Sequence, residues 1–228
     1  GDALSDAGFD VLSFDQRGFG ETGGRRAFVT EFSQYTEDVA DLLVERRELG
    51  VPVVLMGHSL GGLVAATYLV GTGPQPDLAV LSAPALAAEI PRWQRVAVPV
   101  LSRVSPRLHV KSDCDGSVLS RDEAVQQAYD NDPLRVDGAT ASLGRQIMTT
   151  MTSTSAQIPQ ISIPALVFHG SDDALVAPAA SESIGRLDNV TRKVWPGLRH
   201  ECMNEPEWPA VVAGVTDWLD EQIRVISK

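Results

Sequence analysis

The chain has 228 residues, is 43% hydrophobic, and carries 19 lysines and arginines against 30 aspartates and glutamates, a formal net charge of −11. This charge repels phosphate backbones, which argues against a nucleic-acid partner and favours a small, neutral or apolar substrate. No stretch approaches the roughly 18 to 20 apolar residues of a membrane span, and no signal peptide opens the chain, so a cytoplasmic protein with one domain and an insertion is expected.

Short apolar runs alternate with helical patterns, which is typical of an α/β fold with parallel strands and crossover helices. The runs that predict strands are Phe9–Phe14, Val51–Met56, Leu78–Leu81, Ala165–Phe168 and Val190–Trp195. Between the first two runs, apolar residues at spacings of three, four and seven predict a helix that ends at Gly50. A last helix is expected from Pro209 to Ile226, because proline suits a first helical turn.

The alternation stops between Ala83 and Ile163, where helical fragments and prolines occur without a convincing strand. We interpret residues 84–163 as an inserted helical cap, and residues 1–83 together with 164–228 as the α/β core. The early part of the cap, Ile90–Leu101, is apolar. We interpret it as cap core in preference to a rim that faces lipid, because exposed apolar patches are the exception.

A nucleophile elbow is predicted where the strand Val51–Met56 runs into Gly57-His58-Ser59-Leu60-Gly61-Gly62 and then a helix. The glycines permit a tight turn that holds Ser59 in a strained conformation and exposes its hydroxyl. An ordinary N-cap serine is the alternative, but the preceding strand and the partners that follow favour catalysis. The backbone N–H of Leu60, the residue after the nucleophile, is predicted to belong to the oxyanion hole.

A serine nucleophile needs a base, and the chain has four histidines. His200 follows the last predicted strand, at the sheet edge where sites assemble in doubly wound folds, and is assigned as the base. We expect His58 to point away from the site. His109 lies in the predicted cap, and His169 is interpreted as a core histidine satisfied by hydrogen bonds.

The nucleophile elbow is typical of the α/β-hydrolase fold, which uses the order Ser, Asp, His. The acid is therefore expected between the nucleophile and the base in sequence. Asp172 and Asp173 both follow the penultimate strand. We choose Asp173 and keep Asp172 as an alternative. Either residue could instead be an ordinary solvent-exposed carboxylate in a turn, without a catalytic role. The acid would fix the tautomer of the base and stabilise its imidazolium form.

With these residues in place, the chain resembles the monoacylglycerol lipase family over nearly its whole length, and most of all the actinobacterial members. The elbow resembles the family's Gly-His-Ser-Met-Gly-Gly, and the match of the acid loop supports Asp173. The segment Asp15–Gly20 resembles the family's Asp-His-Arg-Gly-His-Gly turn, with Gln16 and Phe19 in place of its two histidines. The segments that carry the resemblance are Asp15–Gly20, Gly57–Gly62, Leu81–Pro84, Leu119–Asp122, Tyr129–Leu134, Gly170–Asp173 and Gly197–Glu201.

The resemblance implies hydrolysis of an ester of one fatty acyl chain, with glycerol or a similar alcohol as the leaving group and the cap as an apolar tunnel. Ser59 would form an acyl-enzyme without a metal or organic cofactor. A short-chain carboxylesterase or lysophospholipase with the same triad is an alternative, and a non-catalytic scaffold is a second. Peripheral contact between the cap and a lipid surface is also expected. Cys114 and Cys202 have no metal or redox spacing and are predicted to be free thiols.

One part of the family pattern does not occur in this sequence. The family carries a His-Gly loop upstream of the point where this chain begins, and that loop supplies the second oxyanion donor. Its strand lies between Phe9–Phe14 and Val51–Met56. We therefore expect that N-terminal strands of about 40 residues precede this sequence in a longer protein. Loss of one oxyanion donor typically costs about 10²- to 10³-fold in rate, so the chain alone is expected to be impaired.

Overall fold

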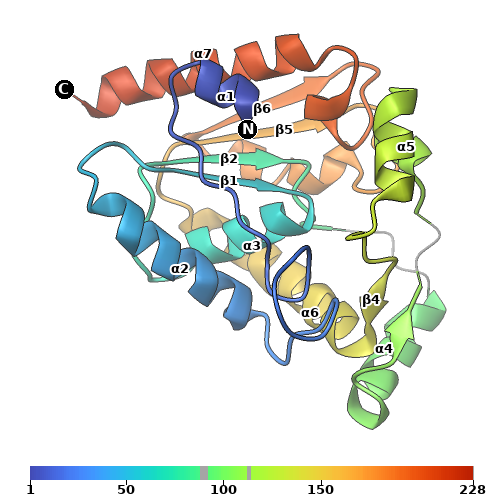
Figure 1. Ribbon diagram of the computed structural model, residues 1–228. Coiled ribbons are helices and arrows are strands. Elements are labelled where there is room, and N and C mark those ends of the chain that lie inside the picture. The colour runs from blue at the N-terminus through green and yellow to red at the C-terminus, as the bar shows by residue number, and fades with distance from the viewer. Residues whose placement is uncertain (88–91, 112–113, 228) are drawn as a thin grey trace.

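The computed structural model describes residues 1–87, 92–111 and 114–227. Its centre is a four-stranded parallel sheet with the order β1-β2-β5-β6 (Figure 1). Every residue of β2 and β5 is buried, as expected for central parallel strands with helices on both faces. The strands are β1 (Val54–His58), β2 (Leu78–Ser82), β5 (Ala165–Gly170) and β6 (Val190–Trp195).

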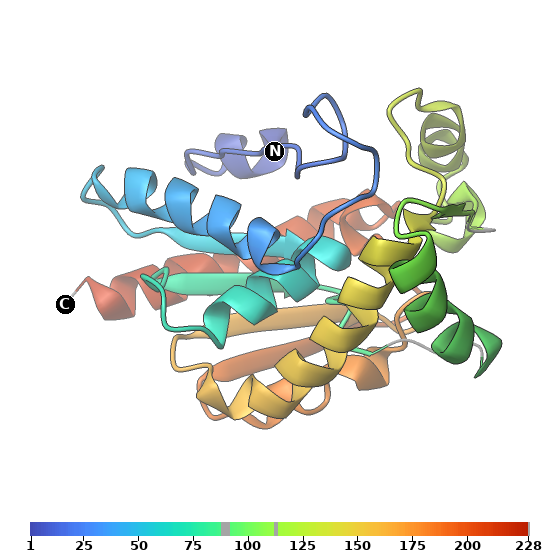
Figure 2. The same ribbon diagram turned by 90° about the horizontal axis from the view of Figure 1, so that it is seen from below.

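Helices cover both faces of the sheet (Figures 1 and 2). α2 (Ser33–Arg47), α3 (Leu60–Leu69) and α6 (Ala141–Gln157) lie on one face, and α7 (Trp208–Ile226) lies on the other with the short α1 (Asp2–Asp6). Two apolar cores result, one on each face of the sheet. Seven of the ten residues of α3 are buried, because this helix is enclosed by the sheet, α2 and α6. The predicted α/β architecture is confirmed.

The apolar run at residues 9–14 does not form the expected strand. A strand needs a neighbour that accepts and donates its backbone hydrogen bonds, and among the described residues no strand pairs with the outer edge of β1. Val11, Leu12 and Phe14 are 37 to 47% exposed, whereas Phe9 packs against the core under α7. The prediction was wrong because apolar character alone does not provide a pairing partner.

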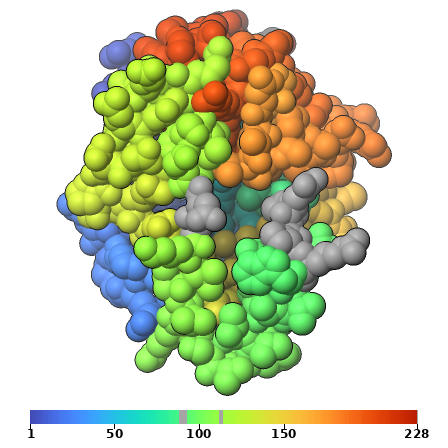
Figure 3. Space-filling model, turned by 90° about the vertical axis from the view of Figure 1, so that its right-hand side faces the viewer, coloured from blue at the N-terminus to red at the C-terminus, as the bar shows by residue number. Residues whose placement is uncertain are grey.

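The segment between β2 and β5 contains α4 (Arg92–Val104), β3 (His109–Val110), α5 (Glu123–Asn131), β4 (Ala139–Thr140) and α6. The antiparallel pair β3–β4 was not anticipated. α4 and α5 project beyond the carboxyl ends of the strands (Figure 1). Figure 3 looks onto this end of the molecule and shows a hollow between the cap segments and the chain that follows β5. α6, by contrast, packs against α3, with Thr67 and Thr154 hydroxyls 2.9 Å apart.

α4 does not bury its apolar face as the sequence analysis expected. Trp93, Val96, Val100 and Val104 are 55 to 77% exposed, while the inner side of the helix packs against α6. The cap-core interpretation of Ile90–Leu101 is therefore wrong for Trp93, Val96 and Val100; Ile90, which was included in it, lies outside the described residues. Over the described part of the chain, no helix has the length and apolar character needed to cross a membrane.

Candidate active site

The backbone around Ser59 is strained and tightly held. Ser59 lies between β1 and α3 with φ 51° and ψ −115°, a conformation that a non-glycine residue adopts at a cost. Its N–H donates to the carbonyl of Ser82 in β2 at 3.0 Å, and its own carbonyl accepts from the N–H groups of Leu63 and Ala85, each at 3.0 Å. These three bonds fix the predicted elbow at the carboxyl ends of the strands.

Glycine is required on both sides of this turn. A Cβ at Gly57 would lie 2.3 Å from the carbonyl oxygen of Gly61, and a Cβ at Gly62 would lie 2.7 Å from Cα of Pro84. Both obstacles are backbone or proline ring atoms, which cannot rotate away. The elbow glycines therefore serve close packing as well as the turn.

We expect Gly57→Ala to lower the free energy of unfolding by about 1 to 3 kcal/mol, as overpacking of a dense region does. The turn must also move to admit the methyl group, and a displacement of about 1 Å at a reacting group costs roughly 10²-fold in rate. Gly61→Ala is the matched control, because its Cβ would meet only the Gln16 side chain at 3.6 Å. Equal urea midpoints for the two variants would contradict this packing argument.

His200 and Asp173 form a buried pair. His200 Nδ1 lies 2.8 Å from Asp173 Oδ2, and Asp173 Oδ1 accepts from the backbone N–H groups of Leu175 and Val176 at 2.9 Å each. Burial raises the pKa of Asp173, but the bond to His200 and the two N–H groups outweigh it and leave this pKa below its ordinary value. Since a carboxylate only accepts, Nδ1 carries the hydrogen and Nε2 is left to accept a proton.

The other candidate acid takes no part in this pair. Asp172 is exposed, and its carboxylate accepts from the hydroxyl of Ser171 at 2.7 Å. Of the two aspartates that the sequence left open, Asp173 is the one that contacts His200 in the described part of the chain.

His58 lies against the base, contrary to the expectation that it points away. The rings of His58 and His200 are 4.7 Å apart between centroids and tilted by 54°, and His58 Nδ1 lies 3.0 Å from the hydroxyl of Ser82. Because His58 adjoins Ser59, this contact places His200 next to the elbow. The described residues show no hydrogen bond between Ser59 and His200; such bonds often tighten only when substrate is bound.

Two histidines near the strand ends resist protonation. Burial lowers the pKa of His58 to about 3 and that of His169 to about 4. His169 Nδ1 lies 3.0 Å from the hydroxyl of Ser181, while its Nε2 has no partner within the described ranges. His169 is thus the buried core histidine that was predicted, although only one of its nitrogens is paired.

We expect acidification from pH 7 to pH 5 to destabilise the protein. The unfolded chain protonates His58 and His169 near an ordinary pKa of about 6.5, whereas the folded protein keeps both neutral. The unfolded state then binds more protons than the folded state. Below this pKa, each of the two histidines therefore lowers the free energy of unfolding by about 1.4 kcal/mol for every pH unit. Urea titrations measure the slope, which His169→Asn should roughly halve. A free energy that does not change with pH would contradict the argument.

Comparison with known proteins identifies the family. The family model described as "Serine aminopeptidase, S33" matches residues 1–207. A monoacylglycerol lipase of Mycolicibacterium smegmatis is 33% identical over 222 residues, which cover 93% of this chain and 79% of that protein. The chain belongs to the monoacylglycerol lipase family.

Further relatives agree with this family assignment. Phospholipase YtpA of Bacillus subtilis is 30% identical over 227 residues, which cover 95% of this chain and 86% of that protein. The crystal structure of the Paleococcus ferrophilus monoacylglycerol lipase has a TM-score of 0.88 at 29% identity, covering 97% of this chain and 87% of that one. The monoacylglycerol lipase family thus accounts for the α/β-hydrolase fold as well as the sequence.

Proposed function

We propose that the protein is a serine ester hydrolase that cleaves monoacylglycerols to a fatty acid and glycerol through an acyl-enzyme on Ser59. The observation that carries the proposal is the buried His200–Asp173 pair, which lies beside the strained elbow of Ser59. The membership in the monoacylglycerol lipase family supplies the substrate class. The protein is accordingly a carboxylic ester hydrolase.

In the first half of the reaction, Ser59 Oγ attacks the ester carbonyl carbon while His200 Nε2 accepts its proton. α3 begins at Leu60, so the N–H of Leu60 is a first-turn donor without an acceptor inside the helix and is available to the oxyanion. The carbon–oxygen bond to glycerol then breaks, and the imidazolium of His200 protonates the departing alkoxide.

In the second half, water attacks the acyl carbon and gives its proton to His200. The bond to Ser59 breaks, Ser59 Oγ recovers the proton, and the fatty acid leaves. Asp173 stays ionised throughout and stabilises the imidazolium. The low pKa of Asp173 suits this role, because a carboxylate that protonates readily would no longer stabilise a cation.

A substrate panel tests the proposal. We would measure kcat/KM for monoacylglycerols of increasing chain length, p-nitrophenyl butyrate and lysophosphatidylcholine, and label the protein with a fluorophosphonate. The highest value is expected for a long-chain monoacylglycerol. A higher value for the lysophospholipid would favour the lysophospholipase alternative, which is kept because the relative YtpA is named as a phospholipase. A folded protein without labelling or hydrolysis would be a scaffold.

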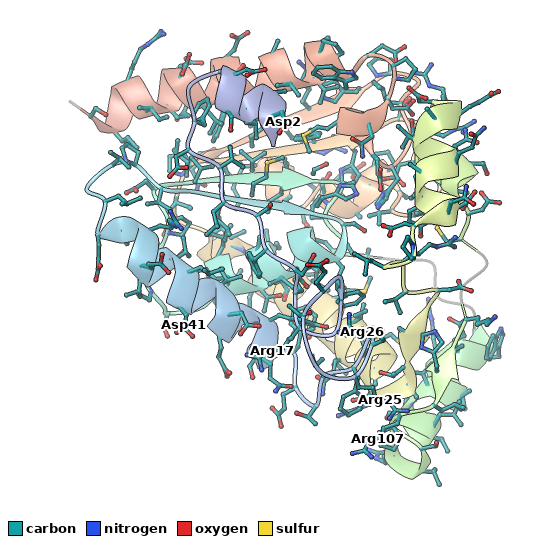
Figure 4. All side chains as sticks on the ribbon, in the orientation of Figure 1. Asp2, Arg17, Arg25, Arg26, Asp41 and Arg107 are labelled. Carbon is teal, nitrogen blue, oxygen red and sulfur yellow. The ribbon has the colours of Figure 1, made fainter. Side chains whose placement is uncertain are left out.

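We further propose that the outer face of α4 contacts an anionic lipid surface. The exposed residues Trp93, Val96, Val100 and Val104 follow one side of the helix. Residues 92–111 contain five basic residues and no acidic one, although the whole chain has a net charge of −11. A basic, tryptophan-bearing amphipathic helix is typical of contacts with membrane interfaces. Figure 4 shows Arg107 at the outer end of the cap, beside α4.

The same proposal places the protein at a cytoplasmic membrane surface. Both cysteines are free thiols, which fits a reducing compartment, and anionic lipids are concentrated in the cytoplasmic leaflet. Flotation with phosphatidylcholine vesicles, with and without phosphatidylserine, provides the test. Binding should require the anionic lipid and be lost in Val96→Asp but not in Val44→Asp, which alters a comparably exposed valine of α2. Absence of flotation by the unaltered protein would refute the contact.

A further inference from the structure

A buried carboxylate that the mechanism does not use lies behind the loop of His200. The side chain of Glu205 is 0% exposed. Its Oε1 accepts from the backbone N–H of Arg199 at 2.7 Å, and its Oε2 accepts from the backbone N–H of Arg121 at 2.9 Å and from the Nε of Arg121 at 3.1 Å. A buried carboxylate is tolerated only when hydrogen-bond donors replace the water that it loses. The donors from Arg199 and Arg121 do this for Glu205.

Glu205 joins two segments that are distant in the sequence. Arg199 directly precedes His200, whereas Arg121 belongs to the region predicted to be the cap. Further hydrogen bonds connect the same two segments: Glu201 N–H to the Leu119 carbonyl at 2.9 Å, Ser120 hydroxyl to the Asn204 carbonyl at 2.8 Å, and Arg199 Nη1 to the Ser120 carbonyl at 3.0 Å. Residues 119–121 and 199–205 therefore form one bonded unit.

The other side of the histidine loop is fixed to the loop after β5. The N–H of Asp172 donates to the carbonyl of Leu198 at 2.9 Å, and the N–H of Gly197 donates to the hydroxyl of Ser171 at 2.7 Å. At Gly170 a Cβ would lie 2.0 Å from the carbonyl oxygen of Leu198. The side of the histidine loop that faces β5 is therefore closely packed, and the side that faces residues 119–121 is held by Glu205.

We infer that Glu205 is a positioning residue for His200, and that Arg121 makes this positioning depend on the cap segment 119–121. The inference rests on the proposed function, in which His200 is the base. One oxygen of Glu205 accepts from the backbone N–H of Arg199, the residue before His200. The other oxygen accepts from Arg121, so Arg121 helps to keep the carboxylate in place. When residues 119–121 are docked, the backbone before His200 is held beside the elbow. When they move away, Glu205 loses both donors of Arg121 and the hydroxyl of Ser120, and the backbone before His200 is released.

Glu205→Gln tests the positioning role with little change in size. Its amide NH₂ must replace one acceptor oxygen, so a donor will face a backbone N–H of either Arg199 or Arg121. We expect kcat for p-nitrophenyl butyrate to fall by about 10- to 10²-fold, the cost of a small displacement of a reacting group, with KM nearly unchanged. Glu207→Gln is the matched control: Glu207 also pairs with Arg121, but it is exposed, and the variant should retain the unaltered kcat.

The time course of fluorophosphonate labelling separates positioning from partial unfolding. A misaligned base slows labelling of Ser59 but lets every molecule react, whereas an irreversibly unfolded fraction lowers the final labelled fraction and leaves the rate constant of the other molecules unchanged. The inference therefore predicts a lower rate constant with a full endpoint for Glu205→Gln. An unchanged rate constant would overturn it. If the unaltered protein were not labelled at all, the proposed function would fail instead.

Arg121 variants test the dependence on the cap. We expect Arg121→Met to slow labelling about as much as Glu205→Gln, and Arg121→Lys to restore part of the rate because its ammonium still faces the carboxylate. The double variant Arg121→Met/Glu205→Gln should be no slower than either single variant, since both changes break the same contact. Additive losses would overturn the coupling to the cap.

Discussion

The Ser59→Ala variant should lose about 10⁶-fold in kcat for monoacylglycerol hydrolysis, the loss typical when a serine hydrolase loses its nucleophile. The methyl group cannot form the acyl-enzyme, and neither His200 nor Asp173 can replace it. Labelling by the fluorophosphonate should disappear as well. The fold should survive, because the three backbone hydrogen bonds that hold Ser59 do not involve its side chain.

The measurement combines hydrolysis, labelling and thermal unfolding. An unfolding midpoint close to that of the unaltered protein makes loss of activity attributable to the hydroxyl. If Ser59→Ala were still labelled, another residue would be the nucleophile, and the proposed mechanism would have to be abandoned.

Asp173→Asn is expected to reduce kcat by about 10⁴-fold, the effect known for the corresponding change in a serine protease triad. The structure supplies a specific reason. The N–H groups of Leu175 and Val176 both donate to Oδ1 of Asp173, so the amide oxygen of an asparagine will remain there and its NH₂ will face His200 Nδ1. His200 must then carry its hydrogen on Nε2, which can no longer accept the proton of Ser59.

Asp172→Asn is the matched control for this prediction. Asp172 is exposed, adjoins Asp173 and does not touch His200, so its change to asparagine should leave kcat within a factor of about two, as a surface substitution does. Steady-state kinetics on both variants decide between the two aspartates. A larger loss for Asp172→Asn would reverse the assignment of the acid.

Much of the site was predictable because its signals are local. The elbow needs glycine beside Ser59 whatever surrounds it, and the order of nucleophile, acid and base follows from the fold. Four of the five expected strands are present, α2 ends close to the predicted Gly50, α3 follows the elbow as expected, and α7 begins and ends close to the predicted bounds. In these places, local pattern and tertiary packing favour the same structure.

The failures concern contacts that local patterns do not encode. Residues 9–14 have the apolar character of a strand, but a strand also needs a partner. His58 was expected to point away, yet the turn that strains Ser59 brings its ring onto His200. Glu205 gave no signal at all, because a glutamate in a polar loop reads as a surface residue until its donors from Arg121 and Arg199 are seen.

The packing of α6 sets a boundary for engineering this enzyme. Leu143 and Met151 of α6 belong to the same core as α3, and Thr140 both caps α6 and donates a hydrogen bond to the carbonyl of Ala27. A chimaera that exchanges the whole insertion would therefore remove part of the core that supports the nucleophile helix. We therefore expect a transplantable module to end before Thr140, with α6 kept from the recipient.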